Sequence, residues 1–178
     1  MNELDVLQDA ADRLNDAGVP YMLTGSLAMN YYAEPRMTRD IDLVINIEPS
    51  DIETFIGAFR EGFYVSPEAV TEAVRQRSMF NLIHNESLVK IDFVVRKDTT
   101  YRKAEFDRRR QVQLEHADVF VVSKEDLIIS KIYWAQESRS EMQQQDVQNL
   151  MATGYDGEYL ERWLKELDLY RFAKEWLT

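Results

Sequence analysis

Hydrophobic positions at the start of the chain change from helical spacing to strand spacing. Four apolar residues recur three or four positions apart, namely Leu4, Leu7, Ala11 and Leu14. This spacing predicts an amphipathic helix. The run 21–24 is short and apolar enough for a buried strand, Gly25 permits a sharp turn, and residues 26–32 contain good helix formers. The pattern therefore predicts a helix, a strand, a tight turn and a second helix.

Alternating apolar and polar positions indicate further strands up to residue 122. Such alternation and β-branched content predict strands over 40–47, 79–83, 88–95 and 117–122. Two capping signatures, at Ser50 after Pro49 and at Ser66 before Pro67, predict helices between the first two of these strands. The arrangement indicates an α/β (α+β) fold with a mixed sheet and flanking helices.

Helical spacing takes over from Ser123 and continues through the rest of the sequence. No low-complexity linker separates this part from the strands. We therefore expect residues 1–122 to form an α/β domain and residues 123–178 to form a C-terminal helical lobe packed on it.

Composition narrows the classes of protein that fit. The sequence contains no cysteine, which excludes disulfides and thiolate metal sites. Its net charge of −11 argues against non-specific coating of nucleic acid, although residues 96–110 carry seven Lys or Arg against three acids. That stretch is interpreted either as a solvated helical face or as a local basic patch. No apolar run approaches the length of a membrane span, and no leader peptide is recognised, so we expect no membrane association and a cytoplasmic location.

Two aspartates are the first candidates for chemistry. Residues two apart on a strand point to the same face, so Asp40 and Asp42 project together while Ile41 projects the other way. Two adjacent negative charges beside an apolar face are costly unless a cation lies between them. Carboxylate oxygens are the ligands that Mg²⁺ prefers, with water and substrate phosphates completing its shell. Charged residues that protect an edge strand are the alternative interpretation.

A third carboxylate and a glycine turn extend this hypothesis. Asp92 lies on the polar side of the expected strand 88–95 and meets the first pair if the two strands are neighbours. Three carboxylates can hold two metal ions roughly 3.5–4 Å apart for displacement at phosphorus. At the turn, Gly25 allows close approach of backbone to phosphate, the following helix N-terminus favours an anion, and Ser26 adds a hydroxyl donor. An ordinary strand-to-helix turn is the alternative.

The order Gly25-Ser26, Asp40-Ile-Asp42 and Asp92 resembles the DNA polymerase β-like nucleotidyltransferase superfamily. More narrowly, the segment 34–44, EPRMTRDIDLV, is similar to the AbiEii-type toxin nucleotidyltransferases and their uncharacterised bacterial relatives. The segment from Asp126 to Asp146, with Lys131 and Arg139 within it, is similar to the helical Lys, Arg and Asp motif of that group. At 143–145 the chain has three glutamines where toxin-like members often carry basic residues.

The resemblance implies a nucleotidyltransferase-like sheet and a set of site roles. Asp40, Asp42 and Asp92 would be metal ligands for Mg²⁺ or Mn²⁺, with Asp92 also activating the attacking hydroxyl. Gly25 and Ser26 would anchor the triphosphate of a nucleoside triphosphate.

Three basic residues are supporting candidates for phosphate contact: Arg36, Arg39 and Lys131. For the two arginines, a structural ion pair is an equally open interpretation. For Lys131 the alternative is a stem that covers the core while its amine reaches solvent.

The expected activity is metal-dependent transfer of a nucleoside monophosphate from a nucleoside triphosphate to an acceptor hydroxyl. The resemblance implies RNA, including tRNA, as one acceptor class, in a toxin–antitoxin or phage-defence setting with a cognate antitoxin. A protein hydroxyl or a small molecule is the rival acceptor. A catalytically inactive module that binds nucleotide or a partner, and a plain interaction role of the acidic surface, remain as alternatives from another class.

Overall fold

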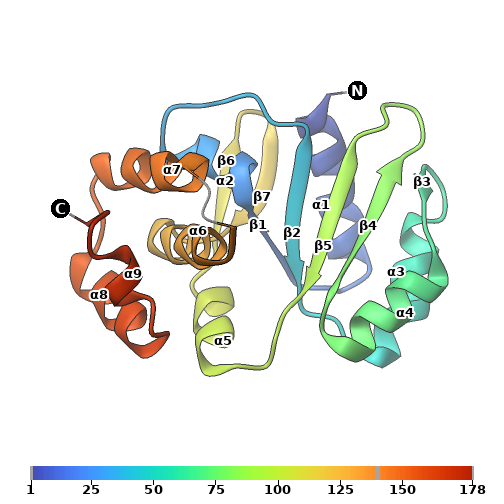
Figure 1. Cartoon of the computed structure of the whole chain (residues 1–178). Helices are drawn as coiled ribbons and strands as arrows, with labels where there is room; N and C mark the ends of the chain where they lie inside the picture. Colours follow the sequence, from blue (N-terminus) through green and yellow to red (C-terminus); the bar gives the residue numbers. More distant parts are fainter. Residues whose placement is uncertain (1, 139–140, 178) are drawn as a thin grey trace.

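The computed structural model describes residues 2–138 and 141–177. Figure 1 shows a twisted central sheet with helices on both sides. The helices are α1 (Glu3–Asp16), α2 (Gly25–Tyr32), α3 (Ile52–Phe59), α4 (Pro67–Gln76), α5 (Thr100–Asp107), α6 (Lys124–Ser138), α7 (Glu141–Ala152), α8 (Gly157–Glu166) and α9 (Tyr170–Ala173), with a 3₁₀ turn over Pro49–Asp51. The strands are β1 (Tyr21–Thr24), β2 (Asp40–Ile45), β3 (Phe63–Tyr64), β4 (Met79–His84), β5 (Lys90–Val95), β6 (Arg110–Leu114) and β7 (Ala117–Val121).

The sheet has seven strands in the order β3-β4-β5-β2-β1-β7-β6. β2 pairs in parallel with β5, and β1 pairs in parallel with β7, whereas the other neighbouring strands are antiparallel. The expected mixed sheet is therefore confirmed. β2 and β5 lie side by side at its centre although about fifty residues of sequence separate them.

One face of the central strands is apolar and packs against helices. The Phe93 ring of β5 lies 5.4 Å from that of Phe55 and 5.7 Å from that of Phe59, both on α3. On β2, Ile41 and Leu43 point to the same side and are fully buried. Burial of these side chains away from water fixes which face of β2 and β5 turns inward, because successive side chains alternate. Polar residues at the intervening positions must then point the other way.

The opposite face is covered only in part. α2 packs on β1 and β2, and α6 packs on α2. The core is continuous from the sheet into the helical region, since it includes Leu127 and Ile128 of α6 and Trp163 of α8. No helix within residues 2–138 and 141–177 is long and apolar enough to cross a membrane.

Local features differ from the sequence expectation at the two edges of the sheet and before α3, and the short edge strand β3 was not expected. The strand β6 (Arg110–Leu114) was not expected, because its polar residues hide the alternation; its side chains are largely exposed at the sheet edge. The capping box before α3 is formed by Glu48 and Asp51 rather than by Ser50. The division into parts 1–122 and 123–178 stays a prediction.

Candidate active site

Four charged side chains lie on one face of the paired strands β2 and β5. In the parallel register Asp42 is opposite Asp92, and Asp40 is opposite Lys90. All four occupy alternate positions, so they share the face turned away from the buried Ile41. Because the strands are neighbours, the three carboxylates predicted from the sequence lie next to one another on this face. We call the four side chains Asp40, Asp42, Asp92 and Lys90 the carboxylate patch, in which Lys90 has the fourth position. Both strands begin at the upper end of the sheet in Figure 1.

The glycine turn lies directly against the patch. Gly25 has φ +67°, and a Cβ added to it would lie 2.1 Å from Oδ2 of Asp42. A side chain at this position is therefore excluded both by the left-handed backbone and by the carboxylate. Thr24, the residue before the glycine, is the antiparallel partner of Asp42. The turn and the carboxylates lie against each other, although Ser26 and Asp42 are sixteen positions apart in the sequence.

Asp42 is the least compensated member of the patch. Its side chain makes no hydrogen bond or ion pair with the residues that the structure describes. Burial first, and then the negative charges of Asp92 and Asp40, raise the pKa of the Asp42 carboxyl to about 6, while the positive charges of Lys90 and Lys131 act in the opposite direction. A carboxylate held without a partner beside two others is an arrangement that a bound cation would relieve.

Lys90 is a site residue that the sequence analysis missed. Its Nζ lies 2.9 Å from Oδ2 of Asp92 and 3.9 Å from Oδ1 of Asp40. The hydrogen bond to Asp92 raises the pKa of Lys90. The sequence could have indicated this residue, because Lys90 is two positions before Asp92 on the same strand and its side chain must therefore point to the same face.

A second cluster, which we call the cation cluster (Arg36, Lys131, Asp146), lies beside Ser26. Nη2 of Arg36 donates to Oγ of Ser26 at 2.7 Å and to Oδ2 of Asp146 at 2.9 Å. Nζ of Lys131 donates to the same Oδ2 at 2.7 Å. Two cations thus share one carboxylate, and Nε of Arg36 is buried without a hydrogen-bond partner among the described residues. The cluster keeps an excess positive charge next to the turn.

Three elements place the cation cluster. The side-chain amide of Asn30 on α2 bonds the backbone N–H and carbonyl of Arg36, both at 3.1 Å, which fixes the loop after α2. Lys131 is on α6 and Asp146 on α7, and both side chains are about 95% buried. Burial lowers the pKa of Lys131, and the bond to Asp146 opposes that shift. Its amine is therefore neither in solvent nor free, which rules out the alternative interpretation of a solvent-facing amine over a core-covering stem, while phosphate contact stays a prediction.

Arg39 does not join either cluster. Its side chain is exposed and makes no hydrogen bond or ion pair within the described part of the chain. The sequence offered the same two interpretations for Arg36 and Arg39, but only Arg36 lies beside Ser26 in the structure. Arg139 lies outside the described residues.

The carboxylate patch has the oxygen donors that a divalent cation requires, but its side chains are not arranged around a common centre. No group of three or more His, Asp or Glu within residues 2–138 and 141–177 has the spacing of a metal site. The oxygen donors of the carboxylate patch are nevertheless the type that Mg²⁺ and Mn²⁺ take, and Asp42 carries uncompensated negative charge. In the structure, the ammonium of Lys90 stands between two of the carboxylates.

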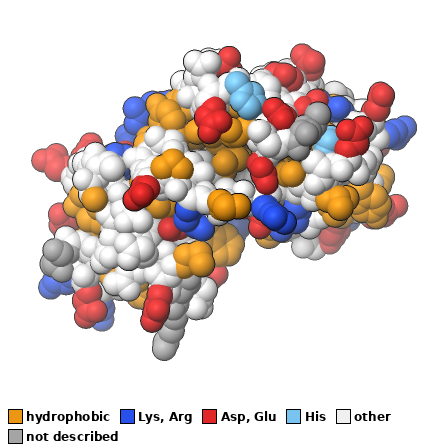
Figure 2. Space-filling model, turned by 90° about the horizontal axis from the view of Figure 1, so that it is seen from above, with side chains coloured by type: hydrophobic (Ala, Val, Ile, Leu, Met, Phe, Trp, Pro, Cys, Tyr) orange, Lys and Arg blue, Asp and Glu red, His pale blue; other side chains and the backbone are white. Residues whose placement is uncertain are grey.

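The cations of the basic stretch 96–110 differ in their surroundings, because Lys97, Lys103 and Arg110 are exposed whereas Arg102 and Arg108 are held in ion pairs with buried acids of this chain. Arg102 pairs with Glu105 at 2.8 Å, and Arg108 pairs with Glu125 and Asp126, both at 3.2 Å. The guanidinium groups of Arg102 and Arg108 are therefore paired with acids of this chain. Figure 2 shows Lys and Arg side chains interspersed with Asp and Glu on the face seen from above.

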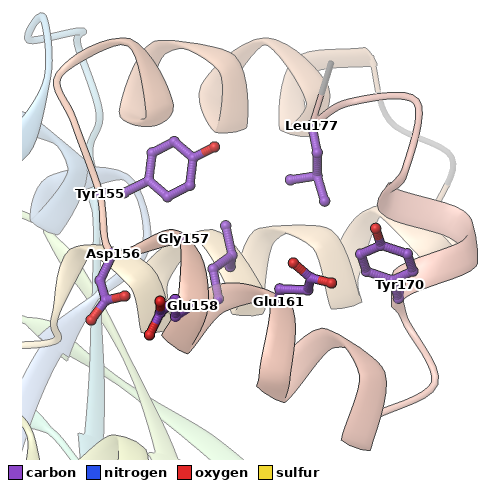
Figure 3. Close-up of a pocket in the computed structure, with 8 residues that line it drawn as sticks. Tyr155, Asp156, Gly157, Glu158, Glu161, Tyr170 and Leu177 are labelled. Carbon is purple, nitrogen blue, oxygen red and sulfur yellow. The ribbon is translucent and has the colours of Figure 1, made fainter.

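A separate hollow of about 690 Å³ lies in the helical region (Figure 3). It is lined by the loop before α8, by α8 itself and by residues near the C-terminus, with the carboxylates of Glu158 and Glu161 and the rings of Tyr155 and Tyr170 at its wall. None of its lining residues belongs to the carboxylate patch or the cation cluster.

Residues 1–175 match a family described as "Nucleotidyltransferase of unknown function (DUF6036)". No curated protein matches the chain in sequence. Among solved structures, an antigenic nucleotidyltransferase-like protein from Paracoccidioides brasiliensis is 20% identical with a TM-score of 0.57, covering 85% of this chain and 75% of that one. A putative nucleotidyltransferase from Thermotoga maritima is 18% identical with a TM-score of 0.53, covering 92% of both chains. A lincomycin-bound lincosamide antibiotic adenylyltransferase is 16% identical with a TM-score of 0.53, covering 80% of this chain and 92% of that one. These likenesses confirm the nucleotidyltransferase-like fold.

Proposed function

We propose that this chain, which belongs to the DUF6036 family of nucleotidyltransferases of unknown function, transfers a nucleoside monophosphate from a nucleoside triphosphate to an acceptor hydroxyl. One observation carries the proposal: the Gly25 turn leaves no room for a side chain between itself and Asp42, which faces Asp92 on the next strand. A turn suited to phosphate and a pair of carboxylates suited to a cation therefore meet at one point.

The carboxylate patch would hold the cation. Asp40, Asp42 and Asp92 supply the oxygen donors for Mg²⁺ or Mn²⁺, which when bound neutralises charge on the triphosphate and on the leaving pyrophosphate. Asp92, whose side chain is 14% exposed, would have a second task, which the family resemblance implies. It accepts the proton of the acceptor hydroxyl as the oxygen attacks the α-phosphorus.

The cation cluster would bind the phosphates that leave. Ser26 lies in the first turn of α2, where free backbone N–H groups and the helix dipole favour an anion. Arg36 already donates to the Ser26 hydroxyl, and its buried Nε has no hydrogen-bond partner among the described residues. Together with Lys131 it presents two positive charges against the single carboxylate of Asp146. A triphosphate seated on Ser26 would supply the missing negative charge.

The acceptor is proposed to be a small molecule or a protein hydroxyl rather than a long RNA. Two cations of the strongest basic stretch of the sequence, Arg102 and Arg108, are paired internally, and the net charge is −11. Long RNA draws much of its binding free energy from exposed Lys and Arg. An RNA end, a tRNA in particular, and a toxin–antitoxin or phage-defence setting with a cognate antitoxin, as in the AbiEii-type enzymes, form the second candidate. It rests on the Arg36 to Asp42 segment and on the Lys131 and Asp146 pair.

The test is a transfer assay with four α-³²P-labelled nucleoside triphosphates and Mg²⁺. Each is incubated with the chain and, in separate reactions, with total RNA, a protein lysate and a panel of small hydroxyl compounds. We expect label in the small-molecule or protein fraction, and a loss of at least about 100-fold in Asp42→Asn, because that change removes a metal-ligand charge.

Asp118→Asn is the matched control, since Asp118 is also a strand aspartate but is exposed on β7, away from the patch. It should transfer label as the wild type does. Label in RNA alone would favour the second candidate. No label in any fraction, with wild type and Asp42→Asn alike, would contradict transfer and leave the two non-catalytic alternatives, an inactive binding module and an interaction role of the acidic surface.

A further inference from the structure

The fourth position of the carboxylate patch is occupied by a cation that belongs to the chain itself. Nζ of Lys90 lies 2.9 Å from Asp92 and 3.9 Å from Asp40, and the Lys90 side chain is 40% exposed. An exposed lysine at the start of a strand is free to turn into solvent. Here it instead lies over the polar face and bridges two acids that come from different strands.

The Lys90 ammonium lies between two carboxylates, Asp92 and Asp40, that a divalent metal ion would also contact. Lys90 contacts Asp92 and Asp40 but not Asp42, which remains without a partner among the described residues. The lysine therefore compensates one side of the patch and leaves the side next to the Gly25 turn open. A divalent ion shared by Asp92 and Asp40 would have to take the place of this ammonium, since two cations cannot occupy one gap between carboxylates.

We propose that Lys90 is a positioning residue that acts as an internal counter-cation: it holds Asp92 in place in the metal-free chain and competes with a divalent ion for Asp92 and Asp40. The proposal rests on the carboxylate patch being the metal site of the proposed function. It implies that the patch binds a divalent ion weakly in the absence of nucleotide. The ammonium leaves Asp92 only when a divalent ion enters with a triphosphate, whose own oxygens add ligands and negative charge.

The test is a Mn²⁺ titration without nucleotide, followed by the electron paramagnetic resonance signal of free Mn²⁺ at low ionic strength. Removing a positive charge about 4 Å from the ion should tighten binding by about tenfold in Lys90→Met and in Lys90→Gln. Lys90→Arg keeps the charge and should bind Mn²⁺ as the wild type does. Lys97→Met is the matched control, because Lys97 is exposed just after the same strand, and its affinity should stay within about twofold.

A second readout uses the wild-type chain. The Nζ resonance of Lys90, assigned by its absence from the spectrum of Lys90→Arg, should shift when Mg²⁺ and a non-hydrolysable nucleoside triphosphate are added together, and shift little with Mg²⁺ alone. Equal or weaker Mn²⁺ binding by the folded Lys90→Met and Lys90→Gln chains would overturn the proposal, as would an Nζ resonance unaffected by Mg²⁺ and nucleotide. Both readouts report binding, so a chain that passes them but transfers no label contradicts only the proposed function.

Discussion

Two groups of carboxylates in the described part of this molecule differ in how their negative charges are compensated. Between α5, α6 and α8, Asp126 is fully buried and accepts hydrogen bonds from the hydroxyls of Tyr159 at 2.8 Å and Ser123 at 2.5 Å. Nε of Arg108 also donates a hydrogen bond to Oδ2 of Asp126, at 3.2 Å. On the open face of β2 and β5, by contrast, Asp42 has no such partner within the described part of the chain.

The contrast separates a structural cluster from a candidate site. Burial of a charged group is tolerated when its hydrogen bonds are made inside the chain, and the helical cluster meets this condition for Asp126. The carboxylate patch does not meet it for Asp42, so the folded chain retains electrostatic repulsion there. Such retained repulsion is typical of sites that bind a ligand supplying the opposite charge.

The largest effect is expected in the structural cluster. Asp126→Ala leaves the Tyr101, Tyr159 and Ser123 hydroxyls and the Arg108 guanidinium without their shared acceptor. We expect the free energy of unfolding, measured by urea denaturation, to fall by about 3–5 kcal/mol. Asp118→Ala, at an exposed strand position, should change it by less than about 0.5 kcal/mol. If Asp126→Ala lowers the free energy of unfolding by less than about 1 kcal/mol, the cluster contributes little to stability.

A smaller effect of opposite sign is expected in the carboxylate patch. The pKa of Asp42 is raised from 3.8 to about 6 on folding, so the ionised form is the one that folding disfavours. The penalty is present above about pH 6 and disappears as the pH falls to about 4.

Asp42→Asn should therefore stabilise the metal-free chain at pH 7.5 by about 1–2 kcal/mol, a value reduced for partial solvent access. The gain should vanish near pH 4. Urea denaturation in the presence of a chelator measures it at both pH values, and a destabilised Asp42→Asn at pH 7.5 would show that Asp42 makes favourable contacts instead.

Several parts of this arrangement followed from sequence pattern and others did not. Alternation placed Asp40, Asp42 and Asp92 on polar faces, because the period of a strand is two. It could not show that β5 is the neighbour of β2, since pairing depends on the whole sheet order. Family resemblance rather than periodicity supplied that expectation.

The basic residues were the hardest to interpret from the sequence. Arg36 and Arg39 lie three residues apart in one loop, yet only Arg36 reaches Ser26 and Asp146. The difference comes from the amide of Asn30, which fixes the backbone at Arg36, and such a side-chain to backbone contact leaves no periodic signal. Lys90 was missed because a lysine at a strand end is usually solvated.

The most direct test of the account is a calorimetric titration with a non-hydrolysable nucleoside triphosphate, with and without Mg²⁺. The wild type and Asp118→Asn should bind it in a Mg²⁺-dependent way, whereas Asp42→Asn should lose the Mg²⁺-dependent part of the affinity, because the ligand charge beside the Gly25 turn is gone. Equal Mg²⁺-dependent binding by Asp42→Asn and the wild type would contradict the claim that the carboxylate patch and the glycine turn form one nucleotide site.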